Sequence, residues 1–258
     1  MRVVVKVGTS TLAHSTGLLN IRHVENLCKV LSDIKNSGVE LALVSSGAIG
    51  VGQGKLSLKE RPSDLPTTQA AAAVGQCELM YTYDKMFGQY NHTVGQVLVT
   101  ASDIEEETRR DNFINTMVRL MQLGALPIIN ENDTVATDEI VIGDNDTLGA
   151  VVAKAIGAEL LIILSDVEGL YDKNPNRDPD AKLLNVVEEI TQEHYDAAEG
   201  SVSKLGTGGM VTKLRAAEIA VSQGCETIIA NGNDPSILYD ILEGKQVGTR
   251  FLAKKKNN

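Results

Sequence analysis

A glycine-rich turn that runs into a helical segment is the strongest chemical signal in the sequence. Residues 206–210 read GTGGM, and Lys213 falls in what we expect to be the first turn of the following helix. Backbone N–H groups at such a turn bind phosphate. The helix dipole disfavours a lysine in this position unless an anion is bound. A glycine turn with a purely structural role would not require a lysine there. The segment therefore predicts a polyphosphate site, although it does not fit the Walker A pattern.

Two strand ends are further candidates for anion binding. Lys6 lies near the end of an apolar run, and the neighbouring Gly8 lets a ligand approach the backbone. Taken alone, Lys6 could equally be a lysine that extends its charged end into solvent. Residues 45–50 read SSGAIG, and a strand that leads through small residues into a helix exposes N–H groups. A tight structural turn explains the glycines but not the paired serines.

Two acidic segments predict recognition of a polar ligand, with an amino group as one candidate. Residues 130–133 read NEND, and residues 143–146 read GDND just before a helical segment. Asp144 or Asn145 could simply cap that helix, but a cap needs only one of them. A calcium-binding loop is excluded, because Leu148 and Ala155 stand where such a loop needs a polar and an acidic ligand.

A fourth polar segment follows another apolar run. Residues 165–172 read SDVEGLYD, and Pro175 comes shortly afterwards. The segment is either a loop bounded by proline or a loop that holds a nucleotide. The sequence leaves both interpretations open.

Alternating strands and helices must position these residues. Strands are expected at residues 3–7, 40–44, 93–100, 126–130, 159–164 and 226–230. Helices are expected at residues 21–34, with Asn20 as N-cap and Gly38 as the stop, and at 69–89, 112–123, 147–156, 190–199 and 210–223. This rotation predicts an α/β fold with a mainly parallel sheet, in which ligands bind beyond the carboxyl ends of the strands. Residues 135–142 alternate differently and predict a hairpin.

Composition limits the possible functions. Hydrophobic residues make up 43% of the 258 residues and aromatic residues only 3%, which predicts an aliphatic core. The net charge of −10 argues against nucleic acid as a partner. The three cysteines, at positions 28, 77 and 225, are expected to be buried free thiols, and the four histidines form no metal-binding pattern. With no leader or membrane span in view, we expect a cytoplasmic protein.

Taken together and in order, six segments resemble the amino acid kinase family. They are VKVGTS, VSSGAIGVG, NENDTVAT, GDNDTLGA, SDVEGLYDKNP and GTGGMVTKL, and the resemblance extends from Val4 to about Phe251. It implies a three-layer α/β/α sandwich around a mainly parallel, eight-stranded sheet. It is strongest to the members that phosphorylate glutamate. It therefore implies ATP and glutamate as substrates, glutamate 5-phosphate as product, and the first step of proline biosynthesis.

The resemblance also implies a role for each matching residue. Lys6 and Lys213 would contact the transferring phosphoryl group, and Asp146 would position both lysines. The implied glutamate-binding residues are Ser46, Asp133 and Asn145. The implied nucleotide-binding residues are Lys6, Ser165, Asp166, Thr207, Gly208, Gly209, Met210, Val211, Thr212 and Lys213. Mg²⁺ would be held mainly through the nucleotide phosphates, so no side chain is assigned to the metal.

Such a kinase needs no catalytic base. A carboxylate acceptor has an ordinary pKa of about 4.3 and is already ionised. An alcohol acceptor would instead require a placed Asp or His. Catalysis then reduces to alignment and to neutralisation of phosphoryl charge, which two lysines and Mg²⁺ can supply.

Two rival functions remain open at this stage. The first is another kinase of the same fold that acts on N-acetylglutamate, aspartate, carbamate or a nucleoside monophosphate. The second is a non-catalytic sensor of ATP or an amino acid, which would not need two lysines and Asp146.

The extent of the chain sets the remaining expectations. We expect one catalytic domain over residues 1–253 and a basic tail over residues 254–258. Many family members carry an additional C-terminal domain that resembles an RNA-binding module, and this chain is expected to be a short form without it. Proline as a feedback inhibitor, the next enzyme of the pathway as a partner, and a homodimer or homotetramer are candidates that come from the resemblance.

Overall fold

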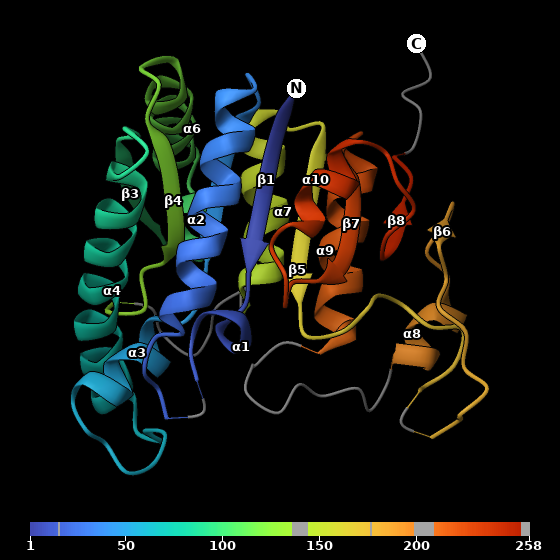
Figure 1. Ribbon diagram of the computed structural model, residues 1–258, viewed down its shortest axis with the longest axis horizontal. Coiled ribbons are helices and arrows are strands. Elements are labelled where there is room, and N and C mark those ends of the chain that lie inside the picture. The colour runs from blue at the N-terminus through green and yellow to red at the C-terminus, as the bar shows by residue number, and fades with distance from the viewer. Residues whose placement is uncertain (15, 136–143, 176, 199–208, 254–258) are drawn as a thin grey trace.

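The fold is an eight-stranded sheet between two layers of helices (Figure 1). The computed structural model describes residues 1–14, 16–135, 144–175, 177–198 and 209–253. The strand order is β3-β4-β2-β1-β5-β7-β8-β6, and only the β7–β8 pair among these is antiparallel. The strands are β1 Arg2–Val7, β2 Glu40–Ser45, β3 Val94–Val99, β4 Leu126–Glu131, β5 Leu160–Ser165, β6 Val186–Val187, β7 Glu226–Asn231 and β8 Thr249–Phe251. The expected α/β fold with a mainly parallel sheet is confirmed.

The helices alternate with the strands along the chain. They are α1 Thr9–Leu12, α2 Ile21–Asn36, α3 Ala48–Lys55, α4 Leu65–Gly88, α5 Ala101–Glu105, α6 Glu107–Gln122, α7 Asn145–Ile156, α8 Gln192–Ala198, α9 Met210–Ser222 and α10 Ile237–Leu242. Helix α2 begins where the sequence predicts, because the Asn20 side chain accepts a hydrogen bond from the His23 N–H.

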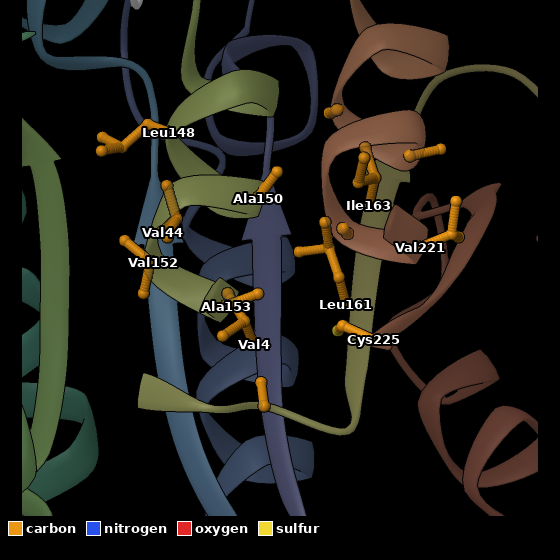
Figure 2. Packing of buried hydrophobic residues seen from close by; sticks show 14 of the residues in the cluster. Val4, Val44, Leu148, Ala150, Val152, Ala153, Leu161, Ile163, Val221 and Cys225 are labelled. Atoms are coloured by element: carbon orange, nitrogen blue, oxygen red, sulfur yellow. The ribbon is translucent and has the colours of Figure 1, made fainter. Parts of the chain in front are cut away.

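Two aliphatic cores fill the spaces between the sheet and its helical layers. Alternate residues of the central strands point to opposite faces, so Val3 and Val5 pack under α2 and α4, whereas Val4 packs under α7. Figure 2 shows the second core, in which Ala150, Val152 and Ala153 of α7 lie over the strands. Small alanine and valine side chains let α7 come close to β1. The first residues of α7 therefore lie at the carboxyl ends of the central strands.

The structure differs from the sequence predictions in a few elements. The strands β6 and β8 were missed because two or three residues are too few to show an alternating pattern. Helices α4 and α6 begin earlier than expected, at Leu65 and Glu107, because the Asp64 and Glu106 side chains cap them. Most of the predicted hairpin, together with the basic tail, lies outside the described residues.

One prediction about the cysteines was wrong. Cys28 and Cys225 are buried, but Cys77 is exposed on α4. The buried side of α4 carries Leu79 and Tyr83, and Cys77 falls on the other side of the helix. None of the helices in the described ranges is both long and apolar enough to cross a bilayer.

Helices α3 and α4 touch through glycine backbone. A Cβ atom at Gly75 would lie 1.8 Å from the Ala48 carbonyl oxygen, and one at Gly52 would lie 1.8 Å from the Ala71 carbonyl oxygen. This contact fixes the position of the first turn of α3, which begins two residues after Ser46. The turn before α3 also depends on Gly47, whose φ of 102° lies in the left-handed region that favours glycine.

We expect Gly75→Ala to lower the free energy of unfolding by about 1–3 kcal/mol, because the added methyl group must push two packed backbones apart. Urea denaturation followed by circular dichroism measures the change. Gly88→Ala is the matched control on the same helix, since nothing lies within 4 Å of a Cβ atom there. Equal stability of both variants would contradict the expectation.

Candidate active site

Four adjacent parallel strands end around one cavity of about 280 Å³. Strand β1 pairs with β2 and β5, and β2 pairs with β4, so their carboxyl ends lie side by side. The cavity is lined by these predicted residues: Lys6, Ser46, Asp133, Asn145, Asp146, Ser165, Asp166 and Lys213. Residues that are up to 207 positions apart in the sequence (Lys6 and Lys213) therefore meet at the predicted edge of the sheet.

Asp146 lies between the two predicted lysines. The Nζ atom of Lys6 lies 2.6 Å from Asp146 Oδ1, and the Nζ atom of Lys213 lies 3.1 Å from Asp146 Oδ2. The Thr212 hydroxyl also donates to Oδ2 at 2.9 Å. All three charged side chains are buried: Lys6 is 6% exposed, Lys213 5% and Asp146 1%. The lysine at the end of β1 is thus held inside the cavity and does not extend into solvent.

Electrostatics keep Asp146 ionised. Burial alone would raise the pKa of its carboxyl group, but the charges of Lys6 and Lys213 outweigh burial and hold the pKa at about 2. The cluster therefore carries two positive charges and one negative charge, so one positive charge is left over at neutral pH. A buried excess of positive charge is a favourable place for an anion.

The acidic segment at the start of α7 both caps that helix and lines the cavity. Asp144 caps the helix, since its Oδ1 atom accepts from the Thr147 N–H at 2.8 Å. Asn145 does something else: its Nδ2 atom donates to Ser46 Oγ and to Asn130 Oδ1, both at 2.9 Å. Capping thus accounts for one residue of the segment. Asn145 and Asp146 have no capping role, and both line the cavity together with Asp144.

A group of acids lines one part of the cavity. Burial raises the pKa of Asp133 to about 6. Burial also raises the pKa of Glu131, with help from the charges of Asp133 and Asp144, and it raises the pKa of Asp144. Each shift means that the negative charge is unfavourable until a cation arrives. This part of the cavity therefore suits a positively charged group such as an ammonium ion.

The predicted nucleotide-binding residues lie on two further elements. Ser165 ends β5, and its hydroxyl donates to Asp166 Oδ1 at 3.1 Å. Gly209 is the N-cap of α9, and Met210, Val211 and Thr212 begin that helix. Among the described residues of this segment, only Lys213 lines the cavity. Thr207 and Gly208 lie outside the described residues.

Sequence reasoning missed part of the site. Arg61, from the loop between α3 and α4, lines the cavity, and no motif singled it out. The resemblance assigns Thr212 to the nucleotide, and the contacts of its hydroxyl with Asp146 and the Gly209 carbonyl oxygen had no signal in the sequence. Asn130 was seen only as part of a polar run, although it is 2% exposed and hydrogen bonds Asn145.

Comparison with known proteins identifies the family of this chain. The sequence profile of the amino acid kinase family matches residues 1–231. Glutamate 5-kinase of Clostridium perfringens (strain 13 / Type A) is 52% identical over 258 residues, which cover 98% of this chain and 96% of that protein. Glutamate 5-kinase of Listeria innocua serovar 6a is 50% identical over 259 residues, which cover 99% and 94%.

Solved structures of more distant proteins share the fold. Carbamate kinase from Giardia lamblia, bound to AMP-PNP, superposes with a TM-score of 0.70 at 17% identity and covers 97% of this chain and 98% of its own. UMP kinase from Ureaplasma parvum gives a TM-score of 0.67 at 14% identity, with 98% of both chains covered. At these identities the likeness concerns the fold. The sequence profile and the relatives at 50–52% identity show the family of the chain. It belongs to the amino acid kinase family, together with the glutamate 5-kinases that it resembles along its length.

Proposed function

We propose that the protein transfers the γ-phosphoryl group of ATP to the γ-carboxylate of glutamate, and so makes glutamate 5-phosphate for proline biosynthesis. The observation that carries this proposal is the pair of buried lysines on one carboxylate, 2.6 Å and 3.1 Å away, beside an acid-lined part of the same cavity. The names of relatives at 50–52% identity support the same activity.

Charge matches the acceptor to the cavity. Glutamate carries an ammonium group and two carboxylates at neutral pH. We assign the ammonium group to the acids near Asp133 and the α-carboxylate to Arg61, because the lysines are already directed to the phosphoryl group. Ser46 and Asn145 complete the acceptor site. An acceptor that carries a phosphate group would instead meet the negative charges of Glu131, Asp133 and Asp144.

The chemical step needs alignment and charge. A γ-carboxylate oxygen attacks the γ-phosphorus, the bond to the β–γ bridging oxygen breaks, and ADP leaves with that electron pair. Lys6 and Lys213 stabilise the charge on the transferred group, and Asp146 fixes the position of both ammonium groups. Ser165, Asp166 and the segment from Thr207 to Lys213 hold the nucleotide.

Magnesium would enter with the nucleotide. Both oxygens of Asp146 already contact a lysine or Thr212, so this carboxylate is not open to a metal. Mg²⁺ binds readily through phosphate oxygens and water, and it would neutralise phosphate charge there. We therefore propose that Mg²⁺ is held mainly by the phosphates of the nucleotide.

The remaining proposals rest chiefly on the family. They are a single catalytic domain over residues 1–253, a cytoplasmic location, feedback inhibition by proline, contact with the next enzyme of the pathway and a homo-oligomer. The oligomer has some support in the fold, because β3 is an edge strand and Tyr81 on the neighbouring α4 is 64% exposed.

Trapping of the acyl phosphate with hydroxylamine tests the acceptor. We expect ATP-dependent hydroxamate formation with glutamate at a rate at least ~10²-fold above aspartate and N-acetylglutamate, because aspartate is one methylene shorter and N-acetylglutamate lacks the ammonium group. ADP release with UMP or carbamate measures the other rivals. Turnover with one of these compounds but not with glutamate would refute the proposal, and ATP binding without any turnover would favour a sensor.

We expect Lys213→Ala to lower kcat by ~10²-fold or more, because it removes a cation that stabilises the transition state. A coupled assay for ADP measures the effect, and the melting temperature shows whether the variant is folded. Lys154→Ala removes an exposed lysine from α7 and serves as the control. A kcat near the normal value would remove Lys213 from the mechanism.

We expect kcat/KM for glutamate to fall below pH ~6. The carboxyl group of Asp133, with a pKa of about 6, is protonated below that pH and loses its attraction for the substrate ammonium group. The γ-carboxylate of glutamate is still ionised at pH 5.5, since its ordinary pKa is about 4.3. Asp133→Asn should raise the glutamate KM and abolish the inflection near pH 6, with little change in the ATP KM. An unchanged pH profile in this variant would rule out Asp133 as the titrating group.

A further inference from the structure

A glutamine outside the cavity is connected to the acceptor site through hydrogen bonds. Gln76 lies on α4, is half-buried, and does not line the cavity. Its Oε1 atom accepts a hydrogen bond of 3.0 Å from Asn130 Nδ2. Asn130 lies at the end of β4 and is 2% exposed, so its amide group depends on protein partners.

A backbone group determines which way the Asn130 amide faces. The Glu131 N–H donates to Asn130 Oδ1 at 2.9 Å, and a backbone N–H can only donate. The oxygen of Asn130 must therefore face Glu131, where it also accepts from Asn145 Nδ2 at 2.9 Å. The nitrogen of Asn130 must face α4, where Gln76 supplies the acceptor.

The same reasoning extends to Asn145. Its Nδ2 atom serves both Asn130 Oδ1 and Ser46 Oγ, so its carbonyl oxygen is turned away from these partners. That oxygen is buried, and no group among the described residues donates to it. A buried acceptor without a donor is unfavourable, and a hydrogen bond from a substrate ammonium group would remove this cost.

We propose that Gln76 is a positioning residue for the acceptor: it fixes the amide of Asn130, which in turn fixes the amide of Asn145 with its oxygen free for the substrate ammonium group. The proposal rests on the proposed function. Gln76 itself touches neither substrate. It acts through two amides that link α4 on one face of the sheet to α7 on the other.

Loss of the Gln76 acceptor should be felt at the acceptor site. Asn130 Nδ2 would be buried without a partner, and the side chain would turn or shift to find one. Asn145 would then lose its fixed orientation, and glutamate would bind less well. The ATP site should be unaffected, because Lys6, Lys213 and Asp146 share none of these hydrogen bonds.

We call the hydrogen bonds that connect Gln76, Asn130 and Asn145 the relay. Three variants test it by steady-state kinetics. Gln76→Met keeps the size of the side chain and the helix propensity but removes the strong acceptor. Gln76→Glu keeps an oxygen acceptor in the same place. Cys77→Ser changes the exposed neighbour on α4 and controls for general effects on the helix. Melting temperatures verify that each variant is folded.

We expect Gln76→Met to raise the glutamate KM by roughly 10-fold, which corresponds to about 1.4 kcal/mol or the loss of one buried hydrogen bond. The ATP KM should stay within ~2-fold, and Gln76→Glu and Cys77→Ser should stay within ~3-fold of the unmodified protein in both constants.

Other outcomes would overturn the relay. A glutamate KM unchanged in Gln76→Met refutes it while leaving the proposed function intact. A parallel rise in both KM values, or equal damage in Gln76→Met and Gln76→Glu, shows a merely structural role. An unmodified protein without glutamate turnover refutes the proposed function itself and the relay with it.

Discussion

The arrangement of the site depends on one buried carboxylate between two ammonium groups. Asp146 can be 1% exposed and ionised only because Lys6 and Lys213 surround it, and each lysine can be buried only because Asp146 is there. The three residues come from the first strand, the first turn of α7 and the first turn of α9. The sheet register and the close packing of α7 on β1 therefore serve to bring three helix and strand ends to one point.

Around this cluster, the cavity separates charges of opposite sign. The excess positive charge near Lys213 suits phosphate, whereas the acids around Asp133 suit an ammonium group. The amides of Asn130 and Asn145 lie among these acids. Each charged end of a zwitterionic acceptor can therefore meet a group of opposite charge. Such a division orients the acceptor before any chemistry occurs, which is the main contribution that a kinase of an ionised nucleophile can make.

Much of this could be predicted from the sequence, and the limits have physical causes. The parallel sheet followed from aliphatic runs, and Lys6 and Lys213 stood out because a lysine at the end of an apolar strand or in the first turn of a helix is unfavourable without a partner. The role of Asp146 came from the family resemblance alone. Arg61 could not be predicted, since a charged residue in a loop is ordinary. Cys77 was misplaced because its segment as a whole is rich in apolar residues, and the rotation of α4 decides which of them face the core. The hydrogen bond between Gln76 and Asn130 joins residues 54 positions apart, and no local pattern reveals it.

Helix α4 carries a close backbone contact with α3 and the support of the acceptor site at neighbouring positions. Gly75 sets how closely the helix approaches α3, and Gln76, the next residue, holds the amide of Asn130. A small rotation or shift of this helix would change both contacts at once. Mutagenesis libraries confined to pocket-lining positions would therefore leave out Gln76, which we propose supports the acceptor site from outside the cavity. Efforts to redirect the enzyme to a new acceptor should sample this helix together with the cavity.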